Sequence, residues 1–188
     1  MLRRSLLTSA IAASLLTTFS LPAFATQVYE TDLVIIGGGL SGLAAAQSAV
    51  DQGAKPIVLE KEAALGGGGN FPEGSLGVGT RYQKEHNINT TVDQVLTAAL
   101  QYHHYRADPH VLRVLIEESG KTIDWVMDKG AQMRGIRTMY PKDESLMTWH
   151  LFKGGAAGII QRFAKEVRAK GGTILTETPA KKLIVEKR

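Results

Sequence analysis

The stretch that decides the fold lies at residues 31–50, which read TDLVIIGGGLSGLAAAQSAV. Residues 31–36 form a short apolar run that ends at glycine, a pattern typical of a buried parallel strand. Residues 43–50 are strong helix formers, Gly53 stands where a helix ends, and residues 55–60 are largely apolar again. A strand, a glycine-rich turn, a helix and a second strand in this order predict an α/β fold built on a parallel sheet.

The turn after the first strand carries three glycines at the spacing of a dinucleotide-binding site, Gly37, Gly39 and Gly42. Gly37 permits a tight turn, Gly39 lets backbone N–H groups approach a pyrophosphate, and Gly42 lets the helix pack closely on the strand. The helix N-terminus favours the negative charge of the phosphates. Glu60 ends the second strand, where its carboxylate can accept from ribose hydroxyls and repels a 2′-phosphate. These residues predict NAD or FAD rather than NADP.

Loops, helices and short strands alternate along the rest of the chain. A loop is expected over residues 65–80, because seven of these sixteen residues are glycine. Thr91 or the threonine before it caps a helix, and Asp108 followed by Pro109 opens the next, since proline suits the first helical position. The other expected elements are a third helix over 119–129, short strands within 131–153, an amphipathic helix over 156–170, and strands over 173–176 and from 183.

Residues 1–25 are predicted to be a cleaved secretory signal peptide. Arg3 and Arg4 open it, an uncharged apolar stretch follows, and Ala23-Phe24-Ala25 provides a small-residue cleavage site. The serines, threonines and proline of the stretch argue against a membrane anchor, which needs about 20 predominantly apolar residues. We therefore expect a periplasmic or secreted protein, exported by the Sec or the Tat route, with no stable membrane insertion.

The composition excludes several classes of protein. Without cysteine, the chain has no disulfide, no thiolate zinc site, no cysteine nucleophile and no covalent c-type haem attachment. The formal net charge of +4 falls to +2 when Arg3 and Arg4 leave with the signal peptide, which removes the main support for a nucleic-acid partner. The adjacent pair His103 and His104 lacks the spacing of a metal site on a helix. We assign no metal ligand and no catalytic residue.

Several segments together are similar to one known family. They are residues 32–46, 58–61 and 65–70, then Trp149-His150 with Gly154-Gly155, then 177–183. These segments resemble the FAD-binding part of the fumarate reductase/succinate dehydrogenase flavoprotein family, most closely its soluble exported members. The resemblance extends over residues 31–188. It implies that residues 26–188 are the N-terminal part of a Rossmann-like, doubly wound α/β FAD-binding domain.

The resemblance also implies which residues bind FAD. The pyrophosphate is expected at Gly37, Gly38, Gly39, Leu40, Ser41 and Gly42, the adenosine at Glu60, Lys61 and the backbone of Ala180, and the ribityl and pyrophosphate groups at Gly67, Gly68 and Asn70. The loop from Glu60 to Asn70 is about two residues longer than in the soluble reductases, so the alignment of its glycines shifts by up to two positions. The following residues 71–76 lack the histidine that tethers FAD in the membrane-bound enzymes, which implies non-covalent FAD.

The activity that the resemblance implies is hydride transfer from reduced FAD to the double bond of a small unsaturated carboxylate, with electrons from a separate donor protein. In the family, the substrate-binding capping domain and a second flavin-binding stretch follow the segment matched here. We therefore expect the chain to be the N-terminal portion of a longer flavoprotein, with an uncertain activity of its own. Two alternatives stay open: a non-catalytic FAD-binding fragment or subunit of a split flavoprotein, and an NAD-linked dehydrogenase.

Four polar positions keep both a functional and a structural interpretation. His150 lies near the expected flavin face, where packing or a loop hydrogen bond is the competing role. Glu73 follows the second glycine loop. Arg134 and Arg137 can meet a carboxylate, although ordinary surface positions explain them as well.

Overall fold

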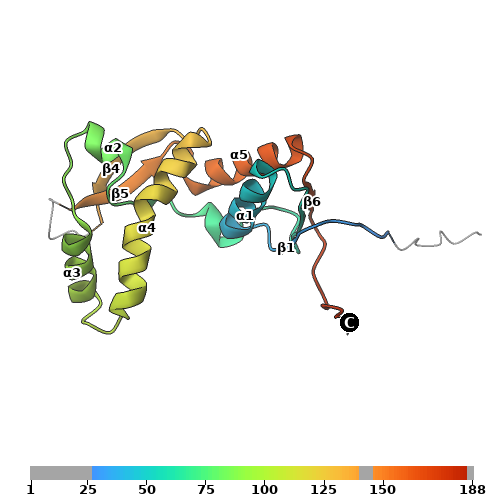
Figure 1. Ribbon diagram of the computed structural model, residues 1–188, viewed down its shortest axis with the longest axis horizontal. Coiled ribbons are helices and arrows are strands. Elements are labelled where there is room, and N and C mark those ends of the chain that lie inside the picture. Colours follow the sequence, from blue (N-terminus) through green and yellow to red (C-terminus); the bar gives the residue numbers. More distant parts are fainter. Residues whose placement is uncertain (1–26, 140–145, 186–188) are drawn as a thin grey trace, which may run out of the picture. The chain divides into compact units, whose positions relative to one another are not determined.

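The computed structural model describes residues 27–139 and 146–185, so the predicted signal peptide lies outside the described residues. The chain divides after Glu30 into two units, and the described helices and strands all belong to the second, from Thr31 onward (Figure 1). None of the helices in the described part of the chain combines the length and apolar character of a membrane span.

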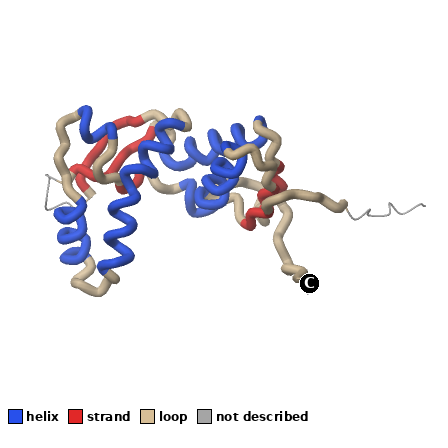
Figure 2. Tube along the Cα trace, viewed as in Figure 1, coloured by secondary structure: helices blue, strands red, loops and turns tan. Residues whose placement is uncertain are grey.

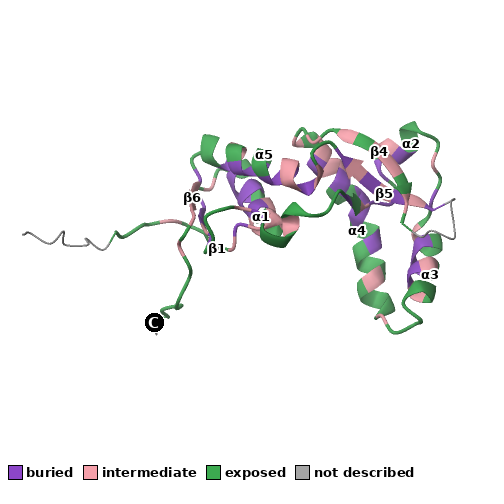
Figure 3. Ribbon diagram, turned by 180° about the vertical axis from the view of Figure 1, so that it is seen from behind, coloured by how far each residue is buried: buried purple, intermediate pink, exposed green. Residues whose placement is uncertain are grey.

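One part of this second unit is a parallel sheet of three strands in the order β1-β2-β6. Its elements are β1 (Val34–Ile36), α1 (Leu40–Asp51), β2 (Ile57–Leu59), α5 (Gly155–Ala169) and β6 (Thr173–Leu175). The helices α1 and α5 pack side by side, and Val58 of β2 and Val167 of α5 are fully buried in the core that they share with the sheet. Figure 3 shows buried residues along α1. The predicted α/β, Rossmann-like fold is confirmed.

The other face of the parallel sheet is open among the described residues. The sequence predicts β1 to be buried, but Val34 is 54% and Ile36 is 60% exposed. Successive side chains of a strand point to opposite faces, and α1 and α5 cover only the face that carries Ile35. The apolar run therefore predicts the strand correctly. No described element covers the second face of that strand, the face with Val34 and Ile36.

The second part is an antiparallel sheet in the order β3-β5-β4, and helices come between β3 and β4 in the sequence. Figure 2 shows these strands in red with blue helices beside them. The 3₁₀ turn η1 (Gly67–Asn70) precedes this sheet and lies against α1 and α5 of the first part. The elements of the second part are β3 (Gly74–Leu76), α2 (Arg81–Glu85), α3 (Val92–Tyr102), α4 (Pro109–Asp128), β4 (Met133–Thr138) and β5 (Met147–Phe152). Val95 of α3 and Ile116 of α4 are buried in one apolar cluster, which holds these two helices together. The strands predicted within 131–153 are thus present.

The predicted N-termini of the helices agree with the structure better than the predicted lengths do. The Thr91 side chain accepts from the Gln94 N–H, and the Asp108 side chain accepts from the His110 N–H, so both predicted caps are confirmed. The prediction of a separate helix over 119–129 is wrong, because α4 is continuous. Gly120 lies inside α4, where a Cβ atom would overlap the Val78 carbonyl group. Gly120 therefore lets the segment that follows β3 approach α4 closely, and it does not end a helix.

Two further expectations need correction. The stretch 65–80 is not only a loop, because it contains η1 and β3 and ends at Thr80, the cap of the short helix α2. A Thr80-x-x-Gln83 capping box signals this helix in the sequence. No strand is described from residue 183, where Leu183, Ile184 and Val185 are exposed. An apolar triplet indicates strand propensity, but a strand also needs a neighbouring strand for its hydrogen bonds.

Candidate cofactor-binding site

The glycine-rich turn between β1 and α1 has the geometry that a pyrophosphate requires. Gly37 has a φ of 102°, open to glycine and strained for other residues, and its N–H donates to the Leu59 carbonyl over 2.8 Å. A Cβ atom at Gly42 would overlap the Gly37 carbonyl. Helix α1 begins at Leu40 with Gly39 as its cap, and no described side chain caps it. Its first N–H groups are therefore available for phosphate oxygens.

Glu60 is buried beside this turn, with 8% of its surface exposed. Its Oε2 accepts from the Gly38 N–H over 2.6 Å, and its Oε1 accepts from the Glu62 N–H over 2.9 Å. These backbone hydrogen bonds, that of Glu62 first, hold the pKa of the Glu60 carboxyl below its ordinary value despite its burial. The ionised carboxylate therefore fixes the turn itself, and each oxygen keeps a lone pair for a ribose hydroxyl.

The second glycine loop lies against the first. The Gly66 N–H donates to the Gly38 carbonyl over 2.9 Å, and Gly66 forms a parallel bridge with Gly39. The Asn70 Nδ2 donates to the Leu65 carbonyl over 2.9 Å, and a Cβ atom at Gly66 would overlap the Asn70 amide. Sequence reasoning did not distinguish Gly66 from its three glycine neighbours, because a run of glycines does not reveal which one makes the close contact.

The other predicted contacts lie around these two loops. Gly67 and Gly68 are exposed in η1, and Leu40 and Ser41 form the first turn of α1. The Thr178 N–H donates to the Glu60 carbonyl over 2.8 Å, and the exposed Ala180 follows two residues later; Lys61 is also exposed and pairs with Glu62 over 3.4 Å. The structure thus brings the segments after β2 and β6 together beside Glu60, with Lys61 and Ala180 exposed next to it.

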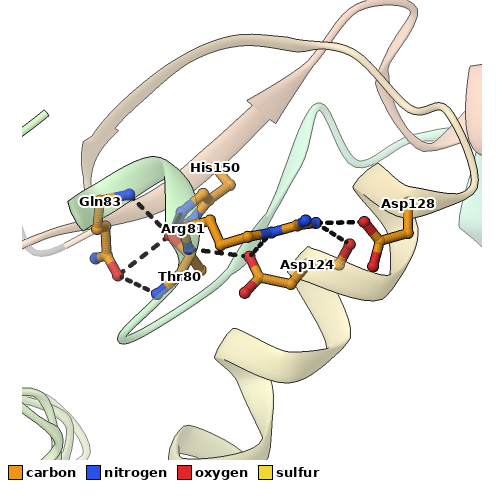
Figure 4. Close-up of polar contacts among 6 residues, drawn as sticks. All are labelled: Thr80, Arg81, Gln83, Asp124, Asp128 and His150. Atoms are coloured by element: carbon orange, nitrogen blue, oxygen red, sulfur yellow. Dashed lines mark hydrogen bonds and ion pairs between the residues drawn. The ribbon is translucent and has the colours of Figure 1, made fainter. Parts of the chain in front are cut away.

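His150 lies in the antiparallel sheet, fully buried. Its Nδ1 faces the Thr148 carbonyl at 3.0 Å, so Nδ1 carries the hydrogen, and Nε2 accepts from the Thr80 hydroxyl at 2.8 Å (Figure 4). Burial lowers the pKa of His150 below its ordinary value, which keeps this tautomer neutral. The contacts support the packing interpretation of His150 over a role beside a cofactor.

The arrangement at the head of α1 fits FAD on three observations. A pyrophosphate needs free N–H groups and close backbone approach, which α1 and Gly39 provide. A ribose needs a fixed carboxylate, which Glu60 provides. The elongated flavin moiety needs a second chain segment beside the turn, which the Gly66 bridge supplies.

Residues 32–188 match the family model described as FAD binding domain, so the chain belongs to this family of FAD-binding flavoproteins. Fumarate reductases are among the relatives and the solved structures to which the chain is similar. The vinyl phenol reductase of Lactiplantibacillus plantarum is 35% identical over 150 residues, which are 79% of this chain and 30% of that protein. A fumarate reductase (cytochrome) of Shewanella frigidimarina is 31% identical over 62% of this chain and 21% of that protein.

Solved structures show the same fold. A flavocytochrome c3 fumarate reductase in its open conformation superposes with a TM-score of 0.66 and 21% identity, over 78% of this chain and 26% of that one. A 3-ketosteroid-Δ4-(5α)-dehydrogenase from Rhodococcus jostii gives 0.67 and 21%, over 82% and 39%. The chain therefore spans less than a third of the vinyl phenol reductase and fumarate reductase relatives that it matches.

Proposed function

We propose that the chain is the FAD-binding N-terminal portion of an exported flavoenzyme that reduces the double bond of a small unsaturated carboxylate. The observation that carries the proposal is the junction at Gly38, where the Glu60 carboxylate and the second glycine loop both bind the backbone of the first turn. When bound, FAD supplies the hydride chemistry. The chain's residues hold it: the first turn of α1 binds the pyrophosphate, Glu60 the ribose, and the Gly67–Asn70 turn the ribityl chain.

The finer parts of the proposal rest on sequence. FAD is bound without a covalent link, because residues 65–80 contain no histidine. We propose a separate donor protein as the source of electrons; this portion of the enzyme has no cysteine for haem attachment. Export follows from the predicted signal peptide. Reductases of vinyl phenol, fumarate, digoxin and acrylate are among the relatives, which supports a reduced carbon–carbon double bond as the shared chemistry.

Titration of the purified chain with FAD and with NAD tests the cofactor. Tight binding of FAD, seen as quenching of flavin fluorescence, is expected, and NAD binding without FAD binding would overturn the proposal in favour of an NAD-linked dehydrogenase. The substitution Glu60→Gln weakens FAD binding, and Glu85→Gln, the same change at an exposed position of α2 outside the cofactor loops, is the control.

A second assay tests the reaction. Chemically reduced viologen dye and fumarate or acrylate are supplied to the FAD-loaded protein, and dye oxidation is followed. Turnover supports the reductase. If the whole gene product binds FAD but turns over no unsaturated acid, the result supports the alternative, a FAD-binding subunit that needs a partner chain for catalysis.

A further inference from the structure

A cluster of three charged side chains lies on the antiparallel sheet, outside the cofactor loops. Arg134 and Arg137 of β4 both reach the Glu73 carboxylate, with Nη2 to Oε2 distances of 3.3 and 3.6 Å. All three side chains are more than half exposed, at 54%, 59% and 61%. Two guanidinium groups therefore converge on one carboxylate that water also reaches.

The backbone explains why both arginines reach the same acid. In a regular strand, residues three apart point to opposite faces. The register of β4 against β5 is irregular between Met133 and Gly135 and again after Arg137, which turns Arg134 and Arg137 toward one side. The Glu73 backbone is fixed as well, because its carbonyl accepts from the Phe152 N–H over 3.3 Å. The strands hold the two arginines at one spot, whichever carboxylate they bind.

The aromatic side chain of Trp149 lies next to this pair of arginines. Arg137 is paired directly with Trp149 across β4 and β5, and Trp149 is only partly buried. A cavity of about 490 Å³ is lined by Arg137, Thr138, Met139 and Trp149. An indole surface suits a flat apolar body, and a guanidinium fork suits a carboxylate. The cavity thus combines the two surfaces that a planar carboxylate requires.

We propose that Arg134, Arg137 and Trp149 form a binding site for a small planar carboxylate, in which Glu73 takes the place of the ligand's carboxylate until the ligand displaces it. Exposed ion pairs contribute little to stability, so little free energy is needed to separate Glu73 from the two arginines. Two cations that face one carboxylate carry a net positive charge, which attracts a further anion. The inference rests on the proposed function only for the choice of an unsaturated acid as ligand. Binding here needs no FAD.

Nitrogen-15 NMR of the indole groups in the purified chain without FAD tests the site. The chain has two tryptophans, and Trp125, which packs on Phe163 at 5.2 Å between ring centroids, serves as an internal control for folding. We expect trans-cinnamate to shift the Trp149 signal and to leave the Trp125 signal in place. The neutral amide of the same acid, of equal size and shape, produces no shift at the same concentration.

Three variants separate a ligand site from a surface ion pair. Arg137→Ala weakens cinnamate binding by about tenfold or more, because a charge-assisted hydrogen bond is lost. Glu73→Gln strengthens it by up to about fivefold, because the internal competitor is gone. Arg113→Ala removes the same charge from an exposed arginine of α4, which pairs with Asp93 of α3 and with Glu117 of its own helix. It leaves cinnamate binding unchanged.

Several results overturn the proposal. Equal shifts with cinnamate and its amide would show an apolar cavity with no carboxylate selectivity. Weaker binding by Glu73→Gln would show that Glu73 only supports the arginines. A glutamate-rich peptide that shifts Trp149 where cinnamate does not would assign the arginines to an acidic protein surface. Loss of FAD binding in the separate titration leaves these NMR outcomes untouched, so the two proposals fail independently.

Discussion

The parallel sheet around β2 and the antiparallel sheet around β5 are held by different kinds of contact. In the first, backbones meet: Gly38 donates to the Glu60 carboxylate and accepts from the Gly66 N–H. In the second, buried side chains meet, with the Thr80 hydroxyl between His150 and the α2 capping box (Figure 4). Backbone groups at an open turn remain available to a ligand, whereas a network whose members satisfy one another gives rigidity and leaves little for a ligand.

The largest effect is expected where the backbone contact is tightest. Gly42→Ala places a Cβ atom onto the Gly37 carbonyl, so we expect loss of FAD binding and a fall in the free energy of unfolding by about 3 kcal/mol. Urea unfolding and FAD titration measure the two effects. Gly68→Ala is the matched control, because nothing lies within 4 Å of its added Cβ, and its stability without FAD is unchanged. Equal stability of the two variants would contradict this account of the turn.

The antiparallel region contains a comparable glycine inside a helix. Alanine normally stabilises a helix interior over glycine by about 1 kcal/mol. Gly120→Ala is expected to do the reverse, destabilising by about 2 kcal/mol, because the Cβ atom meets the Val78 carbonyl. Thermal and urea unfolding give the sign. Thr122→Ala, exposed on the same helix, is expected to be neutral or slightly stabilising, and a stabilising Gly120→Ala would show that α4 can move away from Val78.

The parallel region could be read from sequence because its signals are local. Residues 31–60 contain a strand, three spaced glycines, a helix and Glu60. Each of these features makes its contacts with residues close to it in the sequence. The antiparallel sheet pairs β3 with β5 across some 70 residues, and nothing near Gly74 indicates that Leu151 is its partner. Long-range pairing, like the choice of Gly66 within its glycine run, depends on packing and not on local propensity.

An acid-sensitive contact joins Asp51, at the end of α1 in the parallel region, to Lys129, which caps the end of α4. The Asp51 side chain accepts from Lys129 and Lys170 over 2.6 and 2.7 Å. Burial raises its pKa, but the hydrogen bonds from these lysines outweigh burial and lower the pKa to about 2, from 3.8. Since the folded value is lower, the stabilisation is present above about pH 4 and is lost as the pH falls toward 2. We expect Asp51→Asn to cost about 1–2 kcal/mol at pH 7 and much less at pH 2, where the carboxyl is about half protonated in the folded chain, as measured by urea unfolding at both pH values.

A second pH dependence, in a different window, belongs to the antiparallel region. Because burial lowers the His150 pKa below 6.5, the unfolded chain binds this proton more readily than the folded one. Stability from neutral His150 is therefore present above about pH 6.5 and declines as the pH falls. Between pH 7 and 6 the decline reaches up to about 0.7 kcal/mol. His150→Gln is expected to flatten the curve in this interval, and an unchanged slope in the variant would assign the titration to another group.

The smallest effect is expected for the surface ion pairs of Arg113 in α4, of which the pair with Asp93 joins α4 to α3 and the pair with Glu117 lies within α4. Arg113 reaches Asp93 over 2.9 Å and Glu117 over 3.4 Å, with 44% of its side chain exposed. Water already solvates these charges, so Arg113→Ala changes the melting temperature by less than about 2 °C. Ile116→Ala on the same helix removes a side chain that is 1% exposed and lowers it by several times as much. A larger change for Arg113 than for Ile116 would mean that charges, and not the apolar cluster, join the two helices.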